Sequence, residues 1–138
     1  MAHDLFSNDW AHAWRQAIQA SEAARKEFGG WRWPLVLVAR GTERIAERAV
    51  LLDLYDGVCR AVRVATAQDL EQAPYVLSAD PAIWKRLMEK ALEPLAGLMK
   101  GQLKLVRGSV AALLPYAAAA KELFAAATRV DTRFPEEA

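Results

Sequence analysis

The chain has 138 residues, a length that suits one domain with a substantial core and is too short for two. Hydrophobic residues make up 54% and charged residues 25%, a balance that excludes intrinsic disorder, which requires few apolar groups. Lysine and arginine total 18 against 17 aspartate and glutamate, and the net charge of +1 argues against nucleic-acid binding, which requires a basic excess.

The number of cysteines and the residues at the start of the chain bear on the cellular compartment in which the protein is expected. The only cysteine, Cys59, allows no intramolecular disulfide, and the first nine residues lack the basic and apolar runs of a signal peptide. Lys121 and Glu122 interrupt the alanine-rich stretch, so no segment is expected to span a membrane. We expect one soluble cytoplasmic domain over residues 1–138, with its core at about 6–130 and a frayed polar tail at 131–138.

The first predicted element is an amphipathic helix over about residues 8–28. Trp10, Trp14 and Ile18 recur at intervals of four and therefore share one face. Ser7 or Asn8 can cap the start of this helix, and Gly29 and Gly30 supply a left-handed stop at its end.

A three-stranded antiparallel meander is predicted next. Its first strand begins at Trp33-Pro34, because proline suits the first residue of a strand or an edge. Asp56-Gly57 is a two-residue hairpin signal that joins the second strand to a third over residues 58–65. This turn predicts one apolar face and one ion pair through the opposing residues Tyr55–Val58, Leu54–Cys59, Asp53–Arg60 and Leu52–Ala61.

Short helices and strands then alternate. Thr66 and Asp69 form a capping box for a short helix, which is followed by a fourth strand over residues 75–78. Asp80-Pro81 starts a second substantial helix, and Pro94 starts a short helix that ends at Gly101.

The last part of the chain contains a fifth strand and a divided helical region. Leu103 and Leu105 alternate with polar residues in the strand, and Gly108-Ser109 opens the helical region. Because proline is excluded from a helix interior, we expect a kink at Pro115 and a helix over about residues 114–130.

The sequence offers no catalytic group and calls for no metal or cofactor. His3 lies in an N-terminus expected to be mobile, and His12 lies on the polar flank of the first helix, so neither has a partner. Cys59, opposite Leu54, is predicted to be a buried, inert thiol. An enzyme would need an acid or base, such as Asp53 or Tyr55, that points into a pocket.

Several strings, in this order, resemble the sterol carrier protein type 2 family of small intracellular lipid-binding domains. The resemblance covers about residues 6–130, although the interval from Gly101 to Gly108 is one residue longer than the common family form, with Arg107 extra. The end of the chain lacks the peroxisomal Ser-Lys-Leu tripeptide. The strings are Trp10-Ala11-x-x-Trp14, Asp53-Leu54-Tyr55-Asp56-Gly57, Thr66-Ala67-x-Asp69-Leu70, Tyr75-Val76-Leu77-Ser78, Trp84 with the following Leu87 and Met88, and Pro94-Leu95-x-x-Leu98-Met99-x-Gly101-x-Leu103-Lys104-Leu105.

The resemblance implies an α+β fold in which a five-stranded sheet, an N-terminal amphipathic helix and covering helices enclose a hydrophobic tunnel. Fatty acids, acyl-CoA esters, sterols or phospholipids are the implied ligands. By residue matching, the resemblance gives the lining role to Leu87, Met88, Leu95, Leu98, Met99 and Leu103, and that of tunnel cover to residues 117–124. We add further residues to the predicted lining from the apolar faces of helices, from the apolar face of the hairpin and from the many apolar residues in the second half of the chain. These are Trp14, Ile18, Leu52, Leu54, Trp84, Leu113, Ala117, Ala120 and Phe124.

Composition alone leaves other functions open. A noncatalytic interaction domain would have a filled core and would use aromatic residues such as Trp31 and Trp33 as a surface for self-association or for a protein partner. The sequence leaves the oligomeric state, monomer or homodimer, open. Basic residues in the second half could direct the domain to a membrane surface for transient contact, or could simply keep an apolar domain in solution. These residues are Lys85, Arg86, Lys90, Lys100, Lys104 and Arg107.

Overall fold

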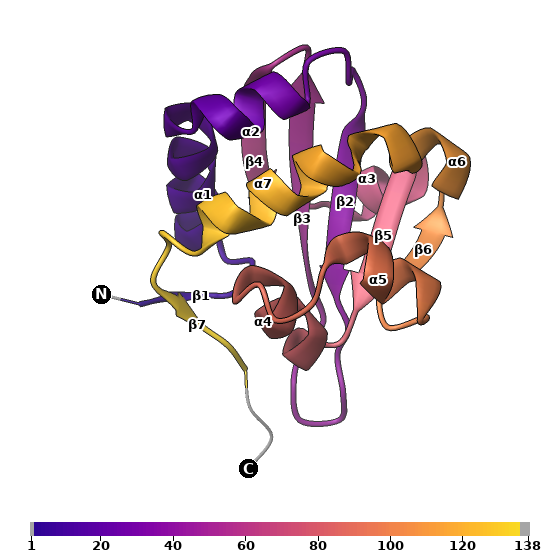
Figure 1. The fold of residues 1–138 in the computed structure, drawn as a ribbon. Helices are drawn as coiled ribbons and strands as arrows, with labels where there is room; N and C mark the ends of the chain where they lie inside the picture. The colour runs from indigo at the N-terminus through magenta and orange to yellow at the C-terminus, as the bar shows by residue number, and fades with distance from the viewer. Residues whose placement is uncertain (1, 136–138) are drawn as a thin grey trace.

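The computed structural model describes residues 2–135, and its main feature is a five-stranded sheet (Figure 1). Strand β2 pairs in parallel with β5, and the other neighbours are antiparallel, in the order β4-β3-β2-β5-β6. The predicted α+β fold with five strands in one sheet is therefore confirmed. The strands are β2 (Pro34–Ala39), β3 (Arg48–Tyr55), β4 (Val58–Val64), β5 (Tyr75–Ala79) and β6 (Lys104–Arg107).

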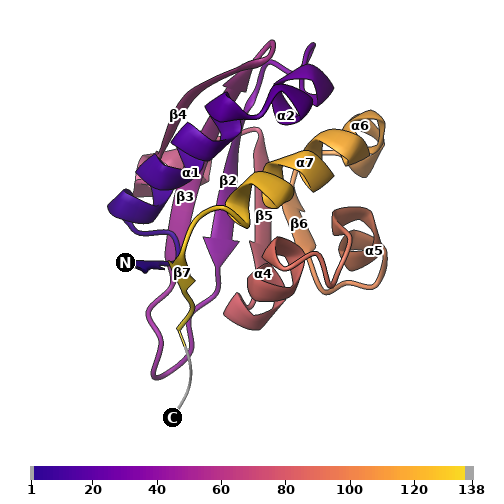
Figure 2. The same cartoon turned by 60° about the vertical axis from the view of Figure 1, so that its left-hand side comes forward.

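Most helices cover one face of the sheet. Figures 1 and 2 show α1, α2 and α7 crossing this face, with α4 and α5 beside them. The helices are α1 (Asn8–Ala20), α2 (Glu22–Glu27), α3 (Ala67–Gln72), α4 (Pro81–Met88), α5 (Pro94–Met99), α6 (Val110–Leu113) and α7 (Ala117–Ala127), with a 3₁₀ turn, η1 (Leu114–Tyr116), between the last two.

Both faces of the sheet are apolar, and each contributes to a separate buried cluster. Leu35 and Leu37 of β2 belong to the main core under the helices, whereas Val36 and Val38 point to the opposite face. The opposite face is covered in part by Leu70 of α3. Along β2, this alternation of leucine inside and valine outside places the longer side chains, which are not branched at Cβ, under the helices.

The first helix is divided, whereas one continuous helix was predicted over residues 8–28. Ser7 caps α1 through a hydrogen bond from the Trp10 N–H, as expected. At Ser21 the backbone becomes extended, and the Ser21 hydroxyl accepts a hydrogen bond from the Ala24 N–H. Ser21 is thus the N-cap of α2, which ends the first helix because a cap residue has non-helical backbone angles.

The hairpin between β3 and β4 contains a bulge that shifts the predicted register. Leu54 pairs with Cys59 as expected, but Leu52 pairs with Val62 and Asp53 with Ala61, so the two further predicted pairings are wrong. Residue 60 is the extra residue of the bulge. The ion pair survives, because Nη2 of Arg60 still lies 3.1 Å from Oδ1 of Asp53.

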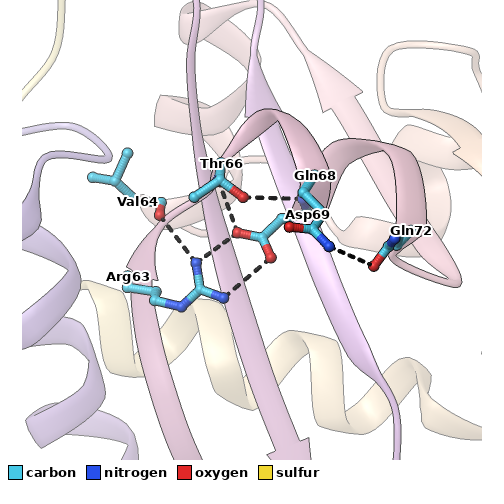
Figure 3. A network of polar contacts seen from close by, with 6 residues as sticks. All are labelled: Arg63, Val64, Thr66, Gln68, Asp69 and Gln72. Carbon is cyan, nitrogen blue, oxygen red and sulfur yellow. Dashed lines mark hydrogen bonds and ion pairs between the residues drawn. The ribbon is translucent and has the colours of Figure 1, made fainter.

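The predicted capping box is present at the start of α3 (Figure 3). The Thr66 hydroxyl accepts a hydrogen bond from the Asp69 N–H, and the Asp69 carboxylate accepts one from the Thr66 N–H at 2.8 Å. Arg63 donates to both oxygens of the same carboxylate. This hydrogen bond from Arg63, together with that from Thr66, lowers the pKa of Asp69 to about 2.

The two chain ends lie together, although they were expected to be mobile and frayed. Residues His3–Asp4 (β1) pair in parallel with Thr132–Arg133 (β7), and Nε of Arg133 lies 2.6 Å from Oδ1 of Asp4. Trp10 of α1 also donates a hydrogen bond to the Thr132 hydroxyl at 2.8 Å. The predicted tail therefore has paired structure at its start, and its residues 136–138 lie outside the described range.

The last helical region is kinked where proline was expected to interrupt it. Pro115 lies in η1, between α6 and α7. Against expectation, the segment Val110–Ala127 is long and apolar enough to cross a membrane by length and composition alone, with a mean hydropathy of 1.4 over 18 residues, although it contains Lys121 and Glu122. In the fold this segment bends at η1, and α7 packs against α1, α2, α4 and α5.

Candidate functional site

The candidate site is a cavity of about 90 Å³ between the sheet and its covering helices. Its floor is formed by leucines of β2, β3 and β5, its sides by α5 and the end of α2, and its cover by α6, η1 and α7. The lining residues are Trp14, Phe28, Trp31, Leu35, Leu37, Leu52, Leu54, Leu77, Pro94, Leu95, Leu98, Leu103, Val110, Leu113, Leu114, Tyr116, Ala117, Ala119, Ala120, Leu123 and Phe124.

The cavity wall is almost entirely apolar. No lining side chain is charged, and only Trp14, Trp31 and Tyr116 carry a polar side-chain atom. The indole N–H of Trp14 donates to the Leu123 carbonyl at 3.0 Å, and that of Trp31 donates to the Trp33 carbonyl at 2.6 Å. The wall therefore suits hydrocarbon, since a buried charge without a partner costs several kcal/mol or more.

The most exposed lining residues of the cavity lie in α5 and in the α6–η1 segment. Among its lining residues, Leu95 of α5 is 36% exposed, Val110 of α6 is 41% exposed and Leu114 of η1 is 48% exposed. The other end lies deeper, where Trp14 stacks on Phe124 with ring centroids 6.4 Å apart. We take the exposed part of the apolar lining as the entrance for a ligand and therefore define the mouth by Leu95, Val110 and Leu114.

Most of the residues predicted from the sequence line this cavity. The structure brings ten of the predicted side chains together around one space, from α1, β3, α5, the residue before β6, α6 and α7. Their role in binding a ligand stays a prediction. The ten residues are Trp14, Leu52, Leu54, Leu95, Leu98, Leu103, Leu113, Ala117, Ala120 and Phe124.

Five predicted residues do not line the cavity. Ile18, Trp84, Leu87 and Met88 are buried, but they fill the solid part of the core. Trp84 is held there because its indole N–H donates to the Val38 carbonyl at 2.9 Å. Met99, the fifth residue, lies at the surface instead of in the core. It is 77% exposed, because α5 ends there and directs this side chain outward.

Sequence reasoning did not single out eleven lining residues, although two of them, Ala119 and Leu123, lie within residues 117–124 that were predicted to cover the tunnel. Many of the others lie on strands or in the α6–η1 segment. Alternation along Pro34–Ala39 and Tyr75–Ala79 could have identified the strand leucines, but valines make the outer face apolar as well. Trp31, which was considered a surface aromatic, is 3% exposed and contacts the rings of Trp33, Tyr75 and Tyr116. The missed residues are Phe28, Trp31, Leu35, Leu37, Leu77, Pro94, Val110, Leu114, Tyr116, Ala119 and Leu123.

The groups that could have served an enzyme lie away from the cavity wall. Asp53 pairs with Arg60, and Tyr55 is 40% exposed beside the same guanidinium. Cys59 is fully buried, and burial raises the pKa of its thiol to about 12. Among residues 2–135, no group of three or more His, Cys, Asp or Glu side chains is placed to hold a metal ion.

Solved structures show close similarity to this chain. A crystal structure of sterol carrier protein 2 is 39% identical, with a TM-score of 0.83, over 92% of this chain and 99% of that chain. A solution structure of a conserved hypothetical protein from Thermus thermophilus, described as "possibly sterol carrier protein", is 37% identical. Its TM-score is 0.83, over 96% of this chain and 94% of that chain. Apo sterol carrier protein 2 from Yarrowia lipolytica shares the fold at 21% identity, with a TM-score of 0.54, over 87% and 84% of the two chains. No family model and no curated protein matches the chain.

Proposed function

The chain belongs to the sterol carrier protein 2 family, and from this premise we propose that it is a lipid-binding domain whose ligand places its hydrocarbon in the cavity. The observation that carries the proposal is a wall of apolar side chains that opens to the surface at Leu95, Val110 and Leu114. Burial of hydrocarbon there contributes about 0.8 kcal/mol per methylene.

The wall also determines which part of the ligand is enclosed. Because no lining side chain is charged, a carboxylate, phosphate or other ionised group of the ligand remains outside the mouth, in water. The proposed ligand is therefore an amphiphile with a hydrocarbon chain, such as a fatty acid or an acyl ester. We assign no catalytic step to this domain, since Asp53 and Tyr55 do not line the cavity.

The size of the cavity implies that it expands when a ligand enters. Its volume of about 90 Å³ is smaller than the ~150 Å³ of an apolar cavity that holds benzene. A long hydrocarbon chain therefore requires the cover to move away from the sheet. The α6–η1 segment is suited to this movement, because Leu114 is half exposed and Pro115 interrupts the helical hydrogen bonds.

A displacement titration tests the proposal. Delipidated protein is loaded with a fluorescent fatty acid, which is then displaced by saturated fatty acids from octanoic to palmitic acid. Burial of the chain predicts that affinity rises about fourfold for each added methylene until the cavity is full. Equal displacement by octanoic and palmitic acids would exclude chain burial as the source of affinity.

A further inference from the structure

The mouth of the cavity is surrounded by exposed apolar side chains. Leu95 and Met99 are four residues apart in α5, so they lie on the same flank, and they are 36% and 77% exposed. On the other side of the mouth, Val110 and Leu114 are 41% and 48% exposed. We call these four side chains the mouth rim. Figures 1 and 2 show α5 and α6 on the same side of the molecule, at the sheet edge formed by β6.

The chain segment that forms the mouth rim carries only positive charges between its flanking residues Glu93 and Lys121. Between Glu93 and Lys121 the chain carries Lys100, Lys104 and Arg107, and no aspartate or glutamate. All three residues are exposed, in the residue that follows α5 and in the edge strand β6, and the guanidinium of Arg107 also donates a hydrogen bond to the Ala73 carbonyl at 2.8 Å. Glu93, at the start of α5, lies 3.8 Å from the Lys121 ammonium and is therefore partly neutralised.

The cover of the cavity is more apolar than its burial within the protein requires. Val110–Ala127 has a mean hydropathy of 1.4, yet only 28% of this window is buried. The buried positions belong to α7, whereas α6 and η1 contain none. The part of Val110–Ala127 without buried residues, α6 and η1, thus lies at the mouth.

These observations match an anionic lipid bilayer better than a protein partner. We propose that the mouth rim docks on a bilayer that contains anionic phospholipid, with Met99 and Leu114 inserted at the interface and Lys100, Lys104 and Arg107 near the headgroups. Apolar side chains together with cations are the combination by which peripheral proteins bind such surfaces. The inference rests on the proposed function, because a docked mouth allows a lipid to pass between bilayer and cavity without crossing water.

Vesicle binding by point variants tests the proposal. Wild-type protein is sedimented with vesicles of phosphatidylcholine alone and of phosphatidylcholine mixed with phosphatidylglycerol, and stronger binding to the mixed vesicles is expected. Lys100→Ser should weaken that binding about fivefold, and Met99→Ser about tenfold. Neither residue lines the cavity, so binding of the fluorescent fatty acid in solution should not change.

Matched controls lie on other sides of the molecule. Val64, 38% exposed on β4 at the opposite edge of the sheet, controls for the loss of an exposed apolar group, and the exposed Arg129 beyond α7 controls for the loss of a cation. Val64→Ser and Arg129→Ser should leave vesicle binding close to the wild-type value.

Three results would overturn the docking proposal. The first is equal binding of the wild-type protein to neutral and mixed vesicles. The second is an equal loss of vesicle binding in the rim variants and the control variants. The third is self-association in solution that depends on Met99, with no binding to vesicles. Failure of the wild-type protein to bind the fluorescent fatty acid would instead refute the proposed function. The two proposals can therefore fail separately.

Discussion

Enlargement of Ala120 tests whether the cavity is a ligand site or a packing defect. Ala120 lies in α7 and lines the cavity, whose volume of about 90 Å³ would be filled by a phenylalanine ring. At ~24 cal/mol per Å³, complete filling recovers up to ~2 kcal/mol, against an overpacking cost of about 1 to 3 kcal/mol. Ala120→Phe should therefore change stability little, while it weakens fatty-acid binding at least about tenfold, or ~1.4 kcal/mol.

The control is the same substitution six positions further along the same helix. Ala126 is 3% exposed and does not line the cavity, so its neighbours leave no space for a ring. Ala126→Phe should cost about 1 to 3 kcal/mol in the free energy of unfolding. The intrinsic helix preference changes equally in both variants, so it cancels in the comparison.

Two measurements on delipidated protein separate the outcomes. Urea denaturation gives the free energy of unfolding of each variant, and displacement of a fluorescent fatty acid gives the affinity. The reasoning is refuted if Ala120→Phe destabilises the protein as much as Ala126→Phe and leaves the affinity unchanged. In that case α7 would not form the cover of a binding cavity.

Three further predictions concern the surrounding structure. Asp69→Asn should lower stability by about 1 kcal/mol at neutral pH, since it removes the carboxylate that pairs with Arg63 and weakens the acceptor for the Thr66 N–H. Because the pKa of Asp69 is lowered to about 2, this difference should persist above pH ~4 and vanish as pH falls toward 2, in pH-dependent denaturation. Cys59 should react with a thiol reagent at pH ~8 only after unfolding, because burial raises its pKa to about 12, and fast labelling of the native protein would contradict its burial. Trp84→Phe should cost about 1 to 3 kcal/mol through the lost hydrogen bond to Val38, and titration should show unchanged fatty-acid binding.

Local signals in the sequence predicted most of the secondary structure. Proline at the start of helices and strands, Asp56-Gly57 at the hairpin and Thr66 with Asp69 at the capping box act over a few residues, so a single sequence contains them in full. The bulge at residue 60 and the pairing of the chain ends were missed for the opposite reason. Both depend on contacts between segments distant in sequence, which no local pattern encodes.

Only some of the predicted residues line the cavity, because periodicity shows which face of a helix is buried and does not show whether that face packs on side chains or borders a cavity. Trp84 and Leu98 both lie on apolar helix faces, but only Leu98 lines the cavity. The difference arises from what lies opposite each side chain. Trp84 contacts the rings of Phe6 and Phe124, whereas Leu98 faces a region that α7 covers with alanines.

The two ends of α7 therefore differ in how firmly they are held. At the C-terminal end, Phe124 packs against Trp14 and Trp84, and an aromatic side chain enclosed by others is costly to displace. At the N-terminal end, Ala117 and Ala120 border a cavity and lose few contacts when this end moves, and the aromatic contact that must yield there is that of Tyr116 with Trp31, at 4.9 Å between ring centroids. Pro115 lies directly before the loosely held end. Because the mouth lies at the same end, the movement that enlarges the cavity would also widen its opening, so ligand entry and cavity expansion can proceed as one step.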